Sequence, residues 1–419
     1  MAKHHSGKSI GSSQHKKAWT RWLYLVVESI RDDLGASLQC QFENDNDEEA
    51  VRQAFEKLFF DLGVAADVGE MPSFESHAAR TGYALEFFCR SRALAEFLLE
   101  TPSAFAAESN SNSKNEAIYP EFWTNALRGP ECPMLGAYGS HSNSNSNSNE
   151  AYEIVSLGGG PGFDFVGVAM AAAFSFHTSE SSTANVGPRS EIHVTAMDYE
   201  EGWSDLVSAM DKSTRKILTP PIANDDEHSP LPAMSCDWGG KCDITKSILH
   251  EPVNAKCKTL LLGDGKEHAA SRLWICQYCV AENAKALRAS DYIFLKELVR
   301  EMQEGSMVLL TEVVPRLWPE MVRMLDREGL LPMVDVGFRK GYSGKQFLLE
   351  KRSKRRTSTG DGPFGSLDSR TRDQLEHFER LASYHERKVD SGWKRQGRKT
   401  NGSAYHEEQE RRGRKTEQE

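Results

Sequence analysis

The chain has 419 residues, of which 39% are hydrophobic and 27% are charged, and its formal net charge is −10. This length is enough for one large domain with extensions or for two domains. No run of residues approaches the roughly 18 apolar residues of a membrane-spanning helix, which argues against a membrane partner. The polar start lacks the apolar core of a signal peptide, so we expect a cytoplasmic, nuclear or nucleolar protein.

The N-terminal third is predicted to be mainly helical. Residues 1–15 are basic, and we expect them to be disordered. Within residues 16–130, three segments have apolar side chains at helical spacing, which is typical of helices with one buried face. The expected helices cover residues 19–33, 48–62 and 76–100.

Two Ser/Asn tracts, residues 109–113 and 142–149, have nothing to bury and are predicted to be loop insertions. The second tract falls in a linker that we place at residues 131–150. Between the tracts, Tyr119–Trp123 is an aromatic cluster. A place in the core is favoured for this cluster over a base-stacking platform.

The most informative segment follows the linker. The apolar run at residues 153–157 predicts a strand, Gly158–Gly162 predicts a tight turn, and the small residues 166–173 predict a helix. Glycine lets bare backbone approach a ligand closely, and a helix start adds unpaired N–H groups and a partial positive charge. The segment therefore indicates a nucleotide or nucleoside site, with a glycine-rich turn that binds nothing as the alternative.

The glycine loop does not match the dinucleotide fingerprint G-x-G-x-x-G, because Phe163 or Phe165 occupies the third glycine position. The loop Leu157–Gly162 resembles instead motif I of the class I S-adenosylmethionine (SAM) dependent methyltransferases. This resemblance covers residues 151–352. It implies an α/β domain with a seven-stranded, mostly parallel sheet whose last pair is antiparallel, and it implies SAM as the cofactor.

The resemblance also assigns residues to the cofactor. Gly158, Gly160 and Gly162 would bend around its methionine part. The second predicted strand covers residues 191–197. Asp198, at its tip, would hold the ribose, since two carboxylate oxygens can accept from two sugar hydroxyls. Tyr199 is a candidate for packing on the adenine. A helix N-cap is the alternative role for Asp198.

Two further cofactor contacts are less direct. The family commonly has an acid two residues before the first glycine, and this chain has Ser156 there. Asp164, just past the loop, is a candidate to take over part of that contact with the cofactor's amino group. For the adenine amine, the candidates are Asp237 and Asp243, and Asp243 is preferred because its surroundings resemble the end of the third strand.

The catalytic candidates are Tyr278 and Glu282, which directly follow the fourth predicted strand. A base is needed only where the acceptor carries a proton. The alternatives are that Tyr278 stacks on the adenine and that Glu282 caps a helix or faces solvent. This region lacks the Asn/Asp-Pro-Pro-aromatic box found in many enzymes that methylate exocyclic amines, which counts against that chemistry. The later predicted elements are a strand at residues 273–277, a helix at 291–303, a strand at 306–312, a helix at 319–328 and strands at 332–338 and 344–350.

Eight scattered cysteines in a chain of this length are predicted to be reduced thiols. Cys276 and Cys279 form a CxxC pair, and with Cys236 and Cys242 they have the residue types of a four-thiolate zinc site. The CxxC pair sits where a strand passes into a helix. We therefore favour structural cysteines and expect no metal site.

The ends of the chain are basic and its body is acidic. Residues 351–419 carry a net charge of +6, which leaves −16 for residues 1–350. We expect residues 353–419 to be a largely disordered tail with one helix at 367–390, which is amphipathic enough to dock on the body or on a partner. The basic runs at 351–356 and 394–399 are candidates for phosphate contacts or nuclear import, or for a merely solvated tail.

Together these features predict a SAM-dependent methyltransferase. An RNA base, most plausibly in ribosomal RNA, is the preferred acceptor because of the basic ends. A small-molecule or protein methyltransferase is one alternative. A methyltransferase-like subunit that binds a partner without catalysis is another, and the sequence leaves the oligomeric state open.

Overall fold

The computed structural model describes thirteen stretches of the chain. The Ser/Asn tracts, the aromatic cluster 119–123, the linker and the basic run 394–399 lie outside them, as does the run 351–356 apart from Lys351. The described residues are 10–39, 46–68, 73–106, 152–177, 192–218, 234–263, 273–304, 306–312, 315, 317–330, 334–340, 345–351 and 369–390.

A seven-stranded sheet forms the centre of the molecule, with the strand order β3-β2-β1-β4-β5-β7-β6. The first five strands run parallel, and β7 pairs antiparallel with both β5 and β6. The predicted seven-stranded, mostly parallel sheet with an antiparallel last pair is thereby confirmed. The strands are β1 (Tyr152–Leu157), β2 (Ile192–Asp198), β3 (Met234–Lys241), β4 (Leu273–Gln277), β5 (Met307–Glu312), β6 (Val334–Lys340) and β7 (Lys345–Lys351).

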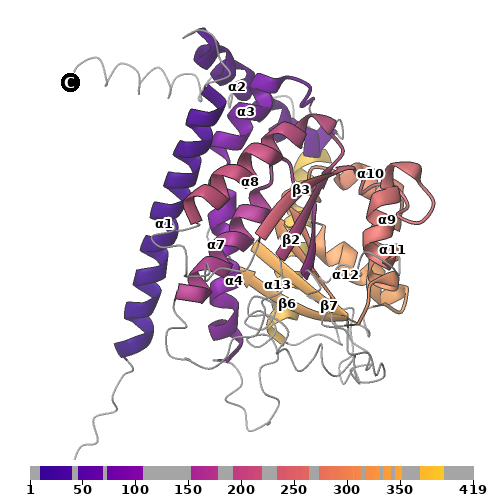
Figure 1. The fold of residues 1–419 in the computed structure, drawn as a ribbon. Coiled ribbons are helices and arrows are strands. Elements are labelled where there is room, and N and C mark those ends of the chain that lie inside the picture. The colour runs from indigo at the N-terminus through magenta and orange to yellow at the C-terminus, as the bar shows by residue number, and fades with distance from the viewer. Residues whose placement is uncertain are drawn as a thin grey trace, which may run out of the picture.

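Helices cover both faces of this sheet, so every residue of β4 and β5 is buried. In Figure 1, α1, α4, α7 and α8 lie on one side of the strands, and α9 to α12 lie on the other. The helices are α1 (Ile10–Gln39), α2 (Asn46–Val68), α3 (His77–Glu86), α4 (Cys89–Ala106), α7 (Phe163–His177), α8 (Ser204–Leu218), α9 (Ala255–Leu262), α10 (Ala284–Ala289), α11 (Ile293–Glu301), α12 (Trp318–Arg327) and α13 (Ser369–Asp390), with short 3₁₀ helices η1 (Glu201–Trp203) and η2 (Pro252–Asn254).

The order of the strands places a crevice at β1. The chain builds from β1 toward β3 on one side and then restarts on the other side with β4. In open α/β sheets, ligands bind at such a switch point, outside the carboxyl ends of the strands. The ends of β1, β2 and β4 are therefore where a site is expected.

The single helix expected at residues 76–100 is in fact two helices, α3 and α4, joined by a turn at Phe87 and Phe88. The turn lets the two helices bury their apolar faces against different partners. Tyr83 of α3 faces Trp203, with ring centroids 5.6 Å apart, whereas Leu94 of α4 faces α7. Continuous apolar spacing cannot reveal this change of partner.

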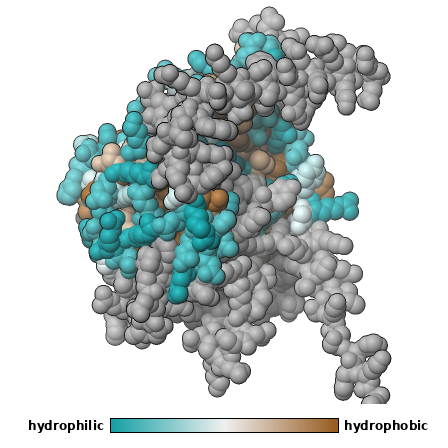
Figure 2. All heavy atoms as spheres, turned by 180° about the vertical axis from the view of Figure 1, so that it is seen from behind, coloured by the Kyte–Doolittle hydropathy of each residue, from teal (hydrophilic) through white to brown (hydrophobic). Residues whose placement is uncertain are grey.

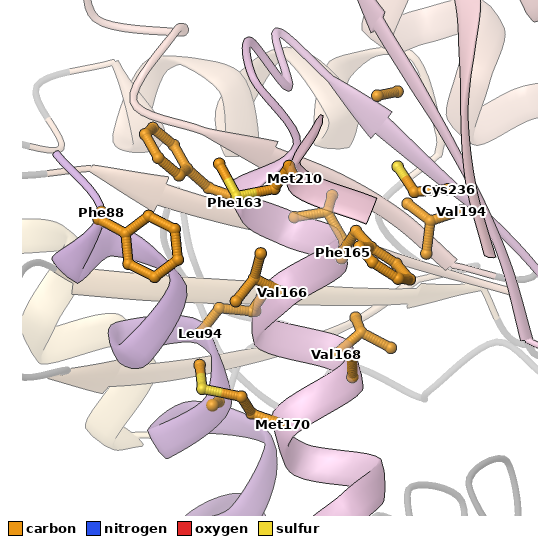
Figure 3. Packing of buried hydrophobic residues seen from close by; sticks show 14 of the residues in the cluster. Phe88, Leu94, Phe163, Phe165, Val166, Val168, Met170, Val194, Met210 and Cys236 are labelled. Carbon is orange, nitrogen blue, oxygen red and sulfur yellow. The ribbon is translucent and has the colours of Figure 1, made fainter. Parts of the chain in front are cut away.

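The packing of α4 on α7 leaves no space at one glycine. Figure 3 shows Phe88 and Leu94 beside Phe163 and Val166, the first residues of α7. A Cβ atom on Gly167 would lie 2.9 Å from both the Leu94 Cβ and the Ser91 carbonyl oxygen. Because that carbonyl belongs to the α4 backbone, the close approach of the two helices requires glycine here.

The C-terminal helix α13 packs on the body of the protein. Leu375 and Phe378 are buried, and the Phe378 ring meets Trp318 of α12 edge-on, with centroids 5.9 Å apart. Arg323 of α12 and Glu379 of α13 form an ion pair beside this contact. We expected this helix to dock either on the body of the protein or on a partner, and in the structure it docks on the body.

In the described part of the chain, no helix combines the length and apolar character that crossing a bilayer requires. On the face seen in Figure 2, the described residues are mostly hydrophilic, and hydrophobic residues occupy small areas among them.

Gly167→Ala should lower the free energy of unfolding by about 1–3 kcal/mol, since the added methyl group overpacks the α4–α7 contact. Gly35→Ala is the matched control, because a Cβ there would meet only the Leu85 Cδ2 at an ordinary 3.8 Å. That control should be neutral or slightly stabilising. Urea unfolding of both variants tests the difference, and equal midpoints would contradict the packing described here.

Candidate functional site

A cleft that encloses about 560 Å³ of empty space, open solvent included, lies at the carboxyl ends of the strands. The loops after β1, β2, β3 and β4 all line it, and Phe74 and Tyr83 close it from the N-terminal region. A smaller adjoining cavity of about 250 Å³ lies against the glycine loop, between Arg90, Asp164 and Tyr278. The crevice expected from the strand order is therefore present.

The predicted strand, turn and helix around the glycine loop are confirmed. Gly158, Gly160 and Gly162 have φ angles of +63°, +48° and +98°, which side chains rarely tolerate. A Cβ atom on Gly158 would also lie 2.9 Å from the Cys279 Sγ. Gly158 and Gly160 line the cleft, whereas Gly162 lies behind it, toward Met210 and Cys236.

Asp198 lies at the end of β2 and is only 6% exposed. One carboxylate oxygen accepts from the Gly160 N–H at 3.1 Å, and the other accepts from the Glu200 N–H at 3.2 Å. Burial raises the pKa of Asp198 to about 6, against these two hydrogen bonds. The N-cap alternative is wrong, because Glu200 caps the following helix η1 through the Gly202 N–H.

Tyr199 follows Asp198 and also lines the cleft. Its ring contacts Phe74, with centroids 6.2 Å apart and a steep angle of 69° between the planes. Phe74 in turn packs against Tyr83 and Trp203. An aromatic wall therefore stands beside Asp198, suited to a planar ring, and stacking of adenine on Tyr199 stays a prediction.

Ser156 and Asp164 lie together, as expected if Asp164 takes over part of the contact made by the acid that the family has at position 156. The Ser156 hydroxyl donates to the Asp164 carboxylate at 2.6 Å, and the Gln277 side-chain amide donates to its other oxygen. Burial raises the pKa of Asp164 to about 6. Asp164 lines the smaller cavity, whereas Ser156 is fully buried and lines neither cavity. The geometry gives Ser156 the role of holding Asp164.

The structure separates the two candidates for the adenine contact. Asp243 lies on the cleft wall, just past β3, where Thr245 donates to it from its N–H at 2.9 Å and from its hydroxyl at 2.6 Å. Asp237 lies within β3, with its side chain 78% exposed and 3.1 Å from the His193 ring. Only Asp243 is placed to reach a ligand in the cleft.

The loop after β4 is fixed by Glu312, a residue that the sequence analysis missed. The Glu312 side chain, at the end of β5, accepts from the Val280 and Ala281 N–H groups at 2.8 and 3.0 Å. Burial raises the pKa of this carboxyl to about 8. Glu312 thereby holds the loop that carries Tyr278 and Glu282. A polar residue ending an otherwise apolar strand was the available signal.

The two catalytic candidates, Tyr278 and Glu282, both line the cleft but differ in how readily they lose a proton. Tyr278 is buried in a left-handed conformation, with φ +62°, and burial raises its pKa to about 12. Glu282 is half-buried, and desolvation raises its pKa to about 7, although the positive charge of Arg90 opposes this shift. Near neutral pH, Tyr278 keeps its proton, whereas Glu282 exchanges one readily.

The thiols of Cys276 and Cys279 are 2.8 Å apart, and Cys279 and Cys242 line the cleft. In the part of the chain that the structure describes, the cysteines are free. No group of three or more His, Cys, Asp or Glu side chains within that part is suited to hold a metal ion. The four-thiolate site considered above is not assembled among these residues.

No family model and no curated protein matches this chain. Solved structures match it at low identity. An O-methyltransferase from Bacillus cereus in complex with S-adenosylhomocysteine (SAH) is 9% identical, with a TM-score of 0.27, and the match covers 62% of this chain and 91% of that one. A TehB-like SAM-dependent methyltransferase from Corynebacterium glutamicum is 10% identical, with a TM-score of 0.27 and coverages of 62% and 100%.

A SAM-dependent methyltransferase from Methanosarcina mazei is 12% identical, with a TM-score of 0.27, and the match covers 48% of this chain and 93% of that one. The assignment of the cleft rests on its own residues, their burial and their charges.

Glu312→Leu should speed hydrogen exchange of the Val280 and Ala281 amides about 10- to 100-fold, because it leaves two buried N–H groups unpaired at about 1–3 kcal/mol. Glu312→Gln is the matched control, since its amide oxygen can accept as the largely protonated carboxyl does. Exchange mass spectrometry of the peptide spanning residues 278–283 gives the comparison. Equal protection of the Val280 and Ala281 amides in both variants would contradict the role of Glu312 in holding the loop after β4.

Proposed function

We propose that this protein is a SAM-dependent methyltransferase. The observation that carries the proposal is the placement of Asp198, a buried carboxylate tied to the glycine loop and open to the cleft at the switch point of the sheet. A ribose diol is the group that two carboxylate oxygens in this position suit best. Asp243 stands on the same wall for the amine of an adenine.

The charge of the site supports the same ligand. The two cavities are lined by four carboxyl groups, those of Asp164, Asp198, Asp243 and Glu282. A dinucleotide would bring a negatively charged pyrophosphate next to them, which is unfavourable. SAM instead carries a sulfonium and an ammonium group. A serine at position 156, where the family commonly has an acid, is the feature that favours a non-catalytic subunit. Asp164, which is hydrogen-bonded to Ser156, supplies a carboxylate in its place.

When bound, SAM would supply an electrophilic methyl group on its sulfonium. The task of the protein is then to position the acceptor and to exclude water. Phe74, Tyr83, Tyr199 and Trp203 give the cleft apolar walls for this. For an acceptor that carries a proton, Glu282 is the base we assign, because its pKa lies near neutral. Tyr278 keeps its proton and serves as part of the wall.

For the acceptor, we propose a base in RNA, with ribosomal RNA as the leading candidate. The basic ends of the chain support a polyanionic partner. The missing amine-methylation box supports an acceptor atom other than an exocyclic amine of that type. Small molecules and proteins are the competing acceptors, and the fate of the label from methyl-labelled SAM separates them from RNA.

Asp198→Ala should weaken SAM binding by about 100-fold or more, because it removes the acceptors for two ribose hydroxyls at about 1.5 kcal/mol or more each. Asp237→Ala is the matched control, since it removes an exposed carboxylate outside the cleft. Calorimetric titration with SAM measures both. Unchanged affinity in the Asp198 variant would overturn the ribose assignment.

Incubation with methyl-labelled SAM and total cellular RNA should place label in nuclease-sensitive material. For a protonated acceptor, the rate should rise with pH through about 7, as Glu282 loses its proton, and Glu282→Gln should lower it about 10²- to 10⁴-fold. SAM affinity should survive in that variant. Label found only in protein or small molecules would contradict an RNA acceptor.

A further inference from the structure

Arg90, the second residue of α4, reaches the site from a region outside the sheet domain. The α4 helix is fixed to α7 by the close contact at Gly167 and by Phe88, whose ring meets Phe163 edge-on with centroids 6.2 Å apart. Since α7 begins where the glycine loop ends, this packing holds Arg90 beside that loop. Arg90 lines the smaller cavity together with Gly158, Gly160 and Asp164.

The guanidinium group of Arg90 is held in place by aromatic rings. Its Cζ lies 4.2 Å from the ring centroids of both Phe87 and Tyr278, and 5.2 Å from that of Tyr83. Its Nη1 donates to the Tyr83 hydroxyl. Arginine has five N–H donors, and this is the one hydrogen bond that the described residues provide. Because Arg90 lines the smaller cavity, its guanidinium can also donate to a ligand bound there.

The charge of Arg90 is opposite to that of the other ionisable groups in the site. Among the described residues that line the two cavities, it is the one cation, against the four carboxyl groups named above. Its nearest carboxylates are not paired with it by any described ion pair. Asp164, in the same cavity, is instead held by Ser156 and Gln277. The cavity therefore presents one fixed cation and one fixed anion, the complement of an α-amino acid group.

The order of the strands says which part of the cofactor would enter this cavity. Asp243 follows β3 and Asp198 ends β2, so the adenine and ribose would lie over that half of the sheet. The rest of the molecule continues toward β1 and β4, where the smaller cavity lies between Gly158 and Gln277. That end of SAM carries an ammonium and a carboxylate.

We infer that Arg90 binds the carboxylate of the cofactor's amino-acid end, with Asp164 facing its ammonium. This inference rests on the proposed function. It makes the N-terminal helices part of the cofactor site, since the anchoring cation comes from α4. A forked guanidinium can meet both carboxylate oxygens at once, so the contact would also fix the direction in which the cofactor enters.

The test compares SAM with decarboxylated SAM, which lacks only the carboxylate. Wild-type protein should bind SAM about 10- to 100-fold more tightly in a calorimeter. Arg90→Met should abolish this preference. Arg92→Met is the matched control, because it removes a guanidinium from the same helix that pairs with Glu96 and lines neither cavity, and it should keep the wild-type ratio.

The outcomes separate this inference from the proposed function. If wild type binds both compounds equally, the carboxylate contact is wrong while SAM binding stands. The same holds if Arg90→Met weakens both compounds alike and keeps the ratio, as a structural role would. If wild type binds neither compound, the proposed function fails and this inference with it. The wild-type ratio decides the question even if Arg90→Met does not fold.

Discussion

The hydrogen bond from the Gly160 N–H to Asp198 is the contact on which the site depends. It joins the loop after β1 to the end of β2, and so fixes the two walls of the crevice relative to each other. A buried carboxylate is costly unless it is hydrogen-bonded. One oxygen of Asp198 accepts from the Gly160 N–H, the other accepts from the Glu200 N–H, and the residue lines the cleft. A ligand with paired hydroxyls would complete this arrangement.

Other loops around the cleft are likewise held by residues from other parts of the chain. Glu312 fixes the loop after β4 from the neighbouring strand, and Asn254 fixes the Asp243 backbone by accepting from its N–H at 2.8 Å. The α4–α7 contact brings Arg90 to the glycine loop. These loops on the cleft are therefore each held by a residue outside the loop, which gives the site a defined shape.

Local patterns predicted the elements whose causes are local. The strand at 273–277 was predicted with the bounds of β4, because a short buried apolar run between turn signals has few other interpretations. The glycine loop and Asp198 were also found from sequence, since strand ends and glycine runs mark them. The helix at 76–100 was wrong at Phe87 and Phe88, where a change of packing partner, not of periodicity, ends α3.

The missed residues act across long distances in the chain. Glu312 binds N–H groups more than 30 positions away, and Arg90 contacts Tyr278 from a different region of the fold. No spacing rule encodes such contacts. The choice of Asp243 over Asp237 was made from a resemblance, and the structure now gives it a physical reason, because Asp237 lies within β3 beside His193, away from the crevice.

A crystal structure of the protein with S-adenosylhomocysteine tests the central claim most directly. The account predicts the ribose hydroxyls within hydrogen-bond distance of Asp198, the adenine beside Tyr199 and Asp243, and the amino-acid end between β1 and β4. A ligand bound elsewhere, or one whose ribose does not touch Asp198, would contradict it.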